Sequence, residues 1–460
     1  MHRSARIALR ATPRQARRLW GLLVSGGDVW ACVLELNALR RARGDAPVVG
    51  YQALCRELAL AGPGTFGELD SVGARSVLRR YSDSWFAAAR ARQAGNGAAR
   101  FPRRRHRLMP VRWYGGTFSV EGRSLRLPTA SGTAPLRLRL ARDVPYTRDQ
   151  LRSVTLLSEA GRLFVEVCAE VPVATYAPGQ GPDPARVAGV DLGVIHPLAV
   201  AGPEGKALLV SGRGIRAESR LHLAERKARS SAGAARAPAR GQRGSRRWRR
   251  FRARSRRMEA RHRRRQAQAR HEETKVVISW AVENQVGTLV VGDPVGVLDH
   301  DGGLRHNQRL RDWRPGAWKA CLSDKATSAG MRVVFVDERG SSSTCPRCRR
   351  RVPKPSGRRF CCPHCGLVGH RDLVGAVNIA ASYGGGGSLV SMPETITHRR
   401  GGRHLPGVGR SRRDPRRIWW YAHRARRRSW PAVARPQDQA SEGSRSSAAT
   451  VRLEDPPTAA

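Results

Sequence analysis

The sequence predicts an α+β protein with two folded regions, and three observations support this prediction. Short strand-like runs surround a stretch of helical periodicity in the first 175 residues. Between residues 187 and 382, apolar strand-like runs alternate with longer helical patterns, and two CxxC pairs interrupt this second region. At 460 residues the chain is long enough for several domains whose cores need no disulfides.

The first region begins with a strand over 3–10, which a helix start follows at once. Thr12 and Gln15 have the spacing of a capping box, and Pro13 stands at the first helical position. Helical patterns follow over 29–42, 50–60 and 68–95, and short strands with glycine turns follow over 109–173. We therefore expect a small β-barrel with a helical insertion after its first strand.

The second region begins with an apolar strand over 187–191 that ends in Asp191. Two further buried strands are expected over 288–291 and 333–336, because short continuous apolar runs mark strands covered on both faces. Shorter strands are expected over 197–201 and 206–211. Helices are expected over 214–285, with a break at 230–245, and over 305–329 and 370–382. From residue 384 the chain is rich in Gly, Arg, Pro and Ser, so we expect a mainly disordered basic tail.

The charge of the chain predicts a polyanionic partner. Its 85 Lys and Arg residues outnumber its 36 Asp and Glu residues, which gives a formal net charge of +49. A chain this basic repels itself unless phosphates neutralise it, so nucleic acid is the expected ligand. An enzyme of acidic substrates, a stand-alone small-molecule enzyme and a secreted disulfide scaffold all fit this charge poorly.

One segment concentrates the positive charge. Between Arg243 and Arg270 there are fourteen arginines and a single acidic residue, Glu259, with Trp248 and Phe251 among them. A cationic helix with aromatic side chains is suited to neutralise phosphates and to stack on bases along RNA or a heteroduplex. A charge run can also be a solvated helix face, but the scarcity of acidic residues favours nucleic acid.

The sequence predicts a cytoplasmic protein, nucleoid-associated when bound to DNA, with no membrane contact. We find no run of eighteen apolar residues, since the best stretch, 20–36, is interrupted by Gly26, Gly27 and Asp28. The first residues carry no apolar segment typical of a secretion signal.

Four of the nine cysteines form two CxxC pairs, Cys345 with Cys348 and Cys362 with Cys365. Each pair places two thiolates on one tight turn, and four thiolates complete a tetrahedral Zn²⁺ site without an open position. We therefore expect a structural zinc ribbon whose finger is the basic segment between the pairs. Free buried thiols are the alternative reading, and Cys361 could replace Cys362 through a shift of one residue.

Two carboxylates are placed to hold magnesium. Asp191 ends an apolar strand, and Asp372 opens the final helix. Oxygen ligands from a strand end and a helix start suit Mg²⁺ and its waters, and a two-metal site for phosphodiester cleavage needs a third acidic group. An Asp at a helix start is by itself more often an N-cap, so the argument depends on both residues together.

The order of these motifs resembles the TnpB family, the transposon-encoded relatives of type V CRISPR effectors. The resemblance is firm over 187–382 and weaker over 1–175, where Phe101-Pro102-Arg103 is one matching piece. It implies an RNase H-like RuvC core, a wedge-like barrel with recognition-like helices, and an RNA-guided endonuclease that uses two Mg²⁺ ions to cut DNA. The implied partners are a guide RNA from the chain's own locus and double-stranded target DNA. The matching segments are 189–194 (GVDLGV), 288–293 (TLVVGD), 342–348 (SSTCPRC) and 371–379 (RDLVGAVNI).

One position departs from the family pattern. The family's second acidic residue usually follows the buried strand as Glu-Asp, whereas this chain has Gly292-Asp293. We expect Glu338, which follows the strand over 333–336, to replace it, because some family members and their eukaryotic relatives use a relocated glutamate. Asp293 is the alternative, although its side chain alternates to the other face if the strand continues. The expected catalytic and magnesium-binding residues are therefore Asp191, Glu338 and Asp372.

Four other functions fit parts of the sequence. An RNA-guided DNA-binding repressor with an inactive nuclease shares every feature except a complete metal site, and Glu338 would then be a solvated turn residue. A compact type V CRISPR effector shares the chemistry and differs in its locus. An actin-like or sugar-kinase ATPase needs further glycine-rich phosphate motifs, which we do not find, and a simple zinc-ribbon binder does not explain the strand-end carboxylates.

The expected domains follow from these assignments, and the motifs leave the choice between monomer and dimer open. In chain order they are a first barrel strand and helix start (1–20), a helical recognition-like insertion (21–100), a wedge-like β-barrel (101–180), a RuvC-like core with its Arg-rich helix at 243–270 (186–340), a zinc ribbon (341–368), the last RuvC helix (369–383) and a disordered basic tail (384–460).

Overall fold

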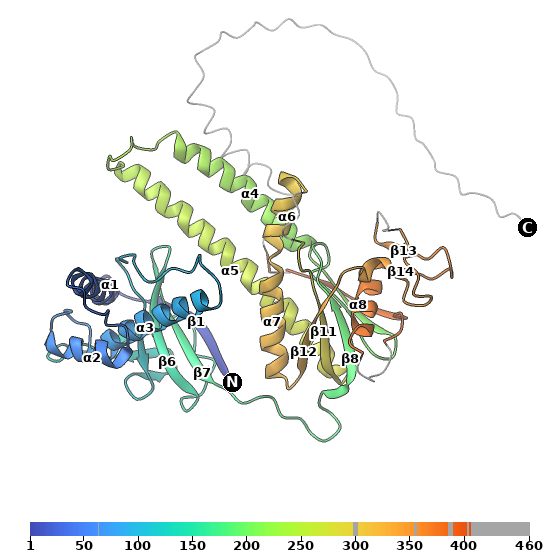
Figure 1. Cartoon of the computed structure of the whole chain (residues 1–460), viewed down its shortest axis with the longest axis horizontal. Helices are drawn as coiled ribbons and strands as arrows, with labels where there is room; N and C mark the ends of the chain where they lie inside the picture. Colours follow the sequence, from blue (N-terminus) through green and yellow to red (C-terminus); the bar gives the residue numbers. More distant parts are fainter. Residues whose placement is uncertain (63, 298–301, 354–356, 385–389, 403, 406–460) are drawn as a thin grey trace, which may run out of the picture. The chain divides into compact units, whose positions relative to one another are not determined.

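The structure is a computed structural model that describes residues 1–405 apart from 63, 298–301, 354–356, 385–389 and 403. Its β structure consists of a seven-stranded sheet, a six-stranded sheet and a two-stranded ribbon, and Figure 1 shows the helices that accompany them.

The seven-stranded sheet is antiparallel throughout, with the strand order β2-β6-β7-β1-β5-β4-β3. In β5 the buried residues Leu136, Leu138 and Leu140 alternate with exposed ones, as in a strand that has one face on the core. The strands are β1 (His2–Arg10), β2 (Val111–Tyr114), β3 (Ser119–Glu121), β4 (Ser124–Leu127), β5 (Leu136–Leu140), β6 (Leu151–Glu159) and β7 (Arg162–Glu170).

The expected closed barrel is a curled half-barrel instead. The short strands β2 and β3 are the two edges of the sheet and do not pair with each other. Helices complete the core in place of closure, because Leu22 and Val77 belong to the same buried cluster as Trp113 and Leu156 of the sheet. The apolar face is therefore covered without a continuous ring of strands.

Three helices lie between β1 and β2, as the periodicity predicts: α1 (Pro13–Ala42), α2 (Tyr51–Leu60) and α3 (Ser71–Gln93). The capping box of α1 is confirmed, since the Thr12 hydroxyl accepts from the backbone N–H of Gln15 and the Gln15 side chain accepts from that of Thr12. Asp70 caps α3 and also accepts a hydrogen bond from Trp113 Nε1 at 2.8 Å, which ties the helix start to β2.

By length and composition, α1 is apolar enough to cross a membrane. It continues through Gly26 and Gly27, where the predicted interruption lies. A side chain at Gly27 would collide with the backbone of His106 and Arg107, so the glycine permits a close contact between the helix and the chain that precedes β2. The buried face of α1 packs in the core of the first region, the position of an interior helix of a folded domain.

The six-stranded sheet has the order β12-β11-β8-β9-β10-β15. Strands β11, β8 and β12 run parallel to one another, whereas β9 is antiparallel to both of its neighbours. The strands are β8 (Asp183–Asp191), β9 (Leu198–Ala201), β10 (Lys206–Ser211), β11 (Val286–Asp293), β12 (Arg332–Asp337) and β15 (Thr395–Arg400).

Helices cover both faces of this sheet. Val190 and Leu289 pack in a cluster with Trp280 of α5 and Leu322 of α7, whereas Val290 packs with Ile379 of α8. Because side chains alternate along β11, its neighbouring residues face the two layers in turn. The helices are α4 (Arg213–Ala234), α5 (Arg246–Glu283), α6 (Leu304–Trp313), α7 (Pro315–Ser328) and α8 (Arg371–Ala381).

Two predictions of elements differ from the structure. The single helix expected over 305–329 is broken into α6 and α7 at Arg314, whose φ is +52°, because Pro315 disfavours a helical residue before it and starts a new helix. The tail expected to be disordered from 384 contains β15, which pairs in parallel with β10 along its whole length. Strand β10 supplies backbone hydrogen bonds to this polar, basic segment, whose local composition alone predicts no regular structure. The part of this tail over 406–460 lies outside the described residues.

Candidate metal centres

The end of β8 and the start of α8 meet closely, which brings Asp191 beside the first turns of α8. A side chain at Gly189 would collide with the backbone of Ala376, so the helix can approach the strand only because residue 189 is glycine. A Cβ atom at Gly375 would lie 3.3 Å from Asp191 Oδ2. Asp191 therefore faces the helix that carries Asp372.

Asp191 lies among other acidic groups. Burial raises its pKa well above the usual value for an aspartate, and the negative charges of Asp372 and Glu338 raise it further. Arg371 and Arg358 oppose this shift. Repulsion between carboxylates that share a site is relieved by a proton or by a bound cation.

Asp372 is buried, with two close partners. Its Oδ2 lies 2.8 Å from His196 Nδ1, and its Oδ1 accepts a hydrogen bond from Arg358 Nη1 at 2.6 Å. Burial raises the pKa of Asp372, but these two partners outweigh it and the net shift is downward. Ligand atoms of His196, His370 and Asp372 all lie within 4.8 Å of one another. The three predicted carboxylates do not form such a group.

Glu338 occupies the space that the missing side chain at 292 leaves. In the parallel register of β11 and β12, Gly292 is paired with Val336, two residues before Glu338. A Cβ atom at 292 would lie 2.8 Å from Glu338 Oε2. The structure thus brings the relocated glutamate to the position from which the family's usual acidic residue would project.

The Glu338 carboxylate forms no ion pair with any residue that the structure describes. Its Oε2 is buried and has no hydrogen-bond partner among the described residues. Burial raises the pKa of Glu338 to about 7, with smaller contributions from Asp293 and Asp337 and an opposing one from Lys319. By contrast, Asp293 forms an ion pair with Lys319 at 2.6 Å, so its charge is already balanced.

The four predicted cysteines come together as one cluster, in which all four sulfur atoms lie within 4.8 Å of one another. Cys345 Sγ is 3.5 Å from Cys365 Sγ, and Cys348 Sγ is 3.6 Å from Cys362 Sγ. A tetrahedral site with Zn–S bonds of about 2.3 Å places its sulfurs roughly 3.8 Å apart, which the cluster approaches. Cys361 is exposed and lies outside the cluster, so the choice between Cys361 and Cys362 falls on Cys362.

The cysteine cluster is connected to the carboxylates by short segments. Its ribbon strands are β13 (Arg359–Cys361) and β14 (Val368–His370), and α8 follows β14 directly. Arg358, which donates a hydrogen bond to Asp372, immediately precedes β13. Asn378 of α8 donates to the carbonyl oxygens of Ser341 and Thr344, both at 2.7 Å, and so fixes the chain that enters the first CxxC turn.

Several of these residues are not predicted from sequence. His196 stands five residues after Asp191 on the same loop, and Arg358 lies within the basic finger between the cysteine pairs. Their proximity to Asp372 depends on contacts across 176 and 14 residues. A histidine that close to a predicted metal ligand is the one local signal available.

The arginine-rich segment forms α5 and pairs with α4 as a helical hairpin. Its single acidic residue, Glu259, is engaged by Arg229 at 2.7 Å and His222 at 3.0 Å of α4. Arg265 pairs with Glu218 of α4 at 3.0 Å. Some of the segment's charge therefore holds the hairpin together, and the expectation that all of it awaits nucleic acid was too broad.

Two family models match parts of the chain. One, described as a probable transposase, matches residues 166–298, and the other, described as the Cas12f1-like TNB domain, matches residues 316–379. No curated protein matches the sequence.

Two solved structures resemble the fold of the chain. The Cas12f1–sgRNA–target DNA complex has a TM-score of 0.58 at 13% identity and covers 80% of this chain and 83% of that chain. The mini-RNA-guided endonuclease CRISPR-Cas_phi3 has a TM-score of 0.51 at 11% identity and covers 85% of this chain and 94% of that chain. With the two family models, these folds support a TnpB-like relative of the compact type V effectors, which confirms the resemblance drawn from the motifs.

Proposed function

We propose that the protein is an RNA-guided DNA endonuclease of the TnpB type with an RNase H-like RuvC core. One observation carries this proposal. The carboxylate missing at Gly292 is replaced by Glu338, whose Oε2 lies where a side chain at 292 would begin and whose charge acts on Asp191. A protein that had lost its nuclease site would have no reason to keep a buried, unpartnered carboxylate there.

The residues fit a magnesium site by their chemistry. Asp191, Glu338 and Asp372 offer the oxygen ligands that Mg²⁺ prefers. Burial and then the charges of Asp372 and Glu338 raise the pKa of Asp191, and a bound cation would relieve this repulsion. When bound, two Mg²⁺ ions supply an activated water and stabilise the leaving 3′ oxygen. His196 contacts one oxygen of Asp372 and Arg358 the other, and each oxygen would keep a second lone pair with which to hold a cation.

The neighbouring residues position these carboxylates. His196 holds Asp372 from the β8–β9 loop, and the tight packing of α8 on Gly189 sets the distance between Asp372 and Asp191. Arg371, on the first turn of α8, is placed to neutralise charge that develops on a bound phosphate. We propose that Zn²⁺ at Cys345, Cys348, Cys362 and Cys365 is structural, since four thiolates leave no open position.

The remaining assignments extend from the resemblance and the charge. We propose that a guide RNA from the same locus pairs with one strand of a double-stranded DNA target, so that base pairing reads most of the sequence. The arginines of α5 that have no carboxylate partner would neutralise phosphates of that RNA or heteroduplex. The probable-transposase match favours a transposon locus over a CRISPR locus. The expected domains and the cytoplasmic, nucleoid-associated location belong to this proposal.

The experiment is guide-directed cleavage of matched DNA by the full chain purified with its locus RNA. Wild type, Asp191→Ala and Asp372→Ala are compared with Asp293→Asn, whose parent residue is paired with Lys319. We expect Mg²⁺-dependent cutting by wild type and Asp293→Asn. The two alanine variants should lose about a thousandfold or more while binding the target normally, because only cleavage needs the cations.

The same experiment distinguishes a nuclease from the alternative, an RNA-guided DNA-binding repressor. The contacts that both oxygens of Asp372 already make favour this alternative. Tight guide-dependent binding by a wild type that does not cut at any Mg²⁺ or Mn²⁺ concentration would establish a binding protein. Loss of binding in Asp191→Ala would show instead that this residue maintains the fold.

A further inference from the structure

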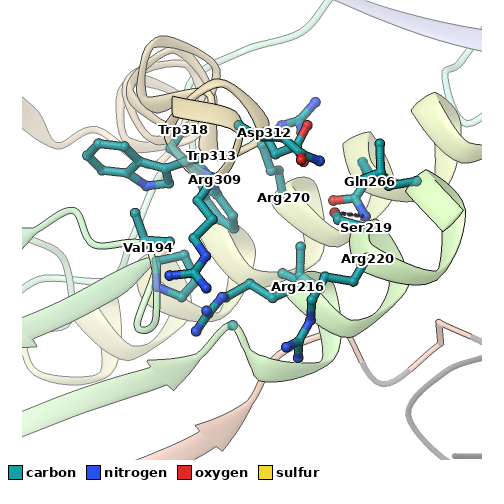
Figure 2. Close-up of a pocket in the computed structure, with 15 residues that line it drawn as sticks. Val194, Arg216, Ser219, Arg220, Gln266, Arg270, Arg309, Asp312, Trp313 and Trp318 are labelled. Atoms are coloured by element: carbon teal, nitrogen blue, oxygen red, sulfur yellow. Dashed lines mark hydrogen bonds between the residues drawn. The ribbon is translucent and has the colours of Figure 1, made fainter. Parts of the chain in front are cut away.

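A cavity of about 230 Å³ opens beside the β8–β9 loop, outside the carboxylate and cysteine centres. Figure 2 shows it between α4, α5 and the α6–α7 pair, with Val194 of the loop at one side. The volume is below the roughly 300–1,000 Å³ of pockets for drug-sized ligands, so it fits a single ring system with its substituents and excludes a dinucleotide cofactor.

Four arginines line this cavity, and none of their guanidinium groups forms an ion pair or hydrogen bond among the residues that the structure describes: Arg216, Arg220, Arg270 and Arg309. Burial lowers the pKa of Arg216, and the charges of Arg220 and Arg309 lower it further, so these guanidinium groups repel one another. Asp312 is the one acidic residue in the lining. The site thus has an excess of positive charge that an anion would relieve.

The rest of the lining is apolar and aromatic. Trp318 is buried and Trp313 half-buried, and both contribute to the cavity wall. Figure 2 shows these two rings on the side opposite Arg220, with Arg309 and Arg216 extending between them. Trp313 Nε1 is buried and has no hydrogen-bond partner among the described residues, so the ring contributes to the wall through its apolar surface. Arginines at one side and indole rings at the other match the phosphate and base of one nucleotide.

The cavity lies close to the carboxylate centre. Val194 and Pro197 line it and belong to the loop that joins Asp191 to β9 and carries His196. The charge of Arg358, which holds Asp372, also acts on Arg216. A strand whose nucleotide occupied the cavity would have neighbouring phosphates within reach of the carboxylates.

We propose that this cavity binds one unpaired nucleotide of single-stranded DNA, with its base against Trp313 and its flanking phosphates on Arg216, Arg220 and Arg309. The binding itself follows from the lining residues, and its use, to hold the strand that is cut, rests on the proposed nuclease function. A cavity of about 230 Å³ has room for one unpaired base and not for a base pair, so the expected ligand is single-stranded.

The test measures the affinity of full-length protein for three labelled probes: a deoxythymidine tetranucleotide, an abasic phosphodiester chain of the same length and a uridine tetranucleotide. Arg309→Ala should weaken binding of the thymidine probe about tenfold and reduce the salt slope of log Kd by about 0.7. Arg311→Ala is the matched control, because it removes the same charge from the same helix at a residue that does not line the cavity. It should change neither quantity.

The base is tested by the abasic probe. Wild type should prefer the thymidine probe by about fivefold or more, and Trp313→Ala should remove this preference while leaving the affinity for the abasic chain unchanged. Loss of affinity for both probes in Trp313→Ala would indicate a folding defect, and Trp313→Phe, which keeps an aromatic ring, should then retain the preference.

Three results would overturn the proposal. Equal affinities of Arg309→Ala and Arg311→Ala would show general charge attraction, equal binding of the thymidine and abasic probes would show that no base enters, and tighter binding of uridine would identify an RNA site. Guide-directed cleavage is measured on the same samples. A wild type that cuts while the two arginine variants bind alike refutes the cavity alone, whereas a cavity that binds as expected in a protein that never cuts refutes the nuclease alone.

Discussion

The cysteine cluster and the carboxylate centre lie next to each other in the chain, but they are assembled in different ways. The cysteines come from two turns, and each turn places its own two sulfurs through local backbone geometry. The carboxylates come from β8, from the residue after β12 and from α8, so their proximity depends on sheet register and helix packing. The first site follows from spacing, whereas the second needs the whole fold.

The two centres also differ in how they tolerate change. A missing cysteine cannot be replaced from elsewhere, because no other thiol joins the cluster among the described residues. A missing carboxylate can be replaced, since neighbouring parallel strands end at the same edge of a sheet. The space at Gly292 and the unpartnered Glu338 oxygen are the observations from which we propose such a replacement.

The largest effect is expected from Cys348→Ser, which breaks the locally assembled site. Removal of one thiolate should release Zn²⁺ and unfold the ribbon, since binding of structural zinc contributes about 10 kcal/mol or more in small zinc domains. Cleavage should be lost as well, because the ribbon leads directly into α8 and so positions Asp372. Metal content by mass spectrometry and cleavage rate are the measurements, and Cys361→Ser is the control, with full zinc and full activity.

A smaller effect is expected from Arg358→Ala, which separates the two centres without unfolding either. Arg358 competes with a cation for Asp372, so its removal should increase the affinity for Mg²⁺ about tenfold. Calorimetric titration of the guide-free protein with Mg²⁺ measures this directly. Arg359→Ala, next to it and exposed, should leave the affinity unchanged, and a weaker affinity in Arg358→Ala would mean that the arginine helps to build the site.

The smallest effect is expected in the pH dependence of stability. The pKa of Glu338 is about 7 in the folded protein against 4.5 for the ordinary group, so the folded state binds the proton more tightly. The corresponding stability is fully present below about pH 4.5 and is lost as the pH rises through 7.

In Mg²⁺-free buffer without a chelator, which leaves the zinc in place, the thermal midpoint of wild type should therefore fall by a few degrees relative to that of Glu338→Gln across this range. Mg²⁺ should reverse the fall in wild type only. Parallel pH profiles of the two proteins would contradict a buried, unpaired carboxylate at 338.

Sequence patterns predict the locally determined parts of this structure well. The capping box at Thr12, the buried strands over 288–291 and 333–336 and the two CxxC turns all depend on residues a few positions apart. Pro315 would have allowed the break at Arg314 to be predicted from sequence. The helical pattern that continues on both sides of it favoured a single helix instead.

The remaining features depend on distant contacts. Nothing near Thr395–Arg400 predicts a strand, since its partner β10 lies almost two hundred residues earlier. The open half-barrel depends on helices that complete the core in place of strands. Within the carboxylate centre, the sequence identifies Glu338 as a strand-end acid, but only the register of β11 and β12 brings it over Gly292.

The most direct test of the relocated carboxylate is to return it to the position that the family usually uses. Guide-directed DNA cleavage would be compared for wild type, Glu338→Ala, the double variant Gly292→Glu/Glu338→Ala, and Asp337→Ala as the control for a neighbouring exposed carboxylate. We predict that Glu338→Ala loses cutting and that the double variant regains a measurable part of it. Removal of the Glu338 carboxylate frees most of the space at 292, and the end of Ile379 and the Cβ atom that remains at 338 must shift slightly to admit the new side chain. Wild-type cutting by Glu338→Ala would contradict the account, because the nuclease would then work without the carboxylate on which it depends.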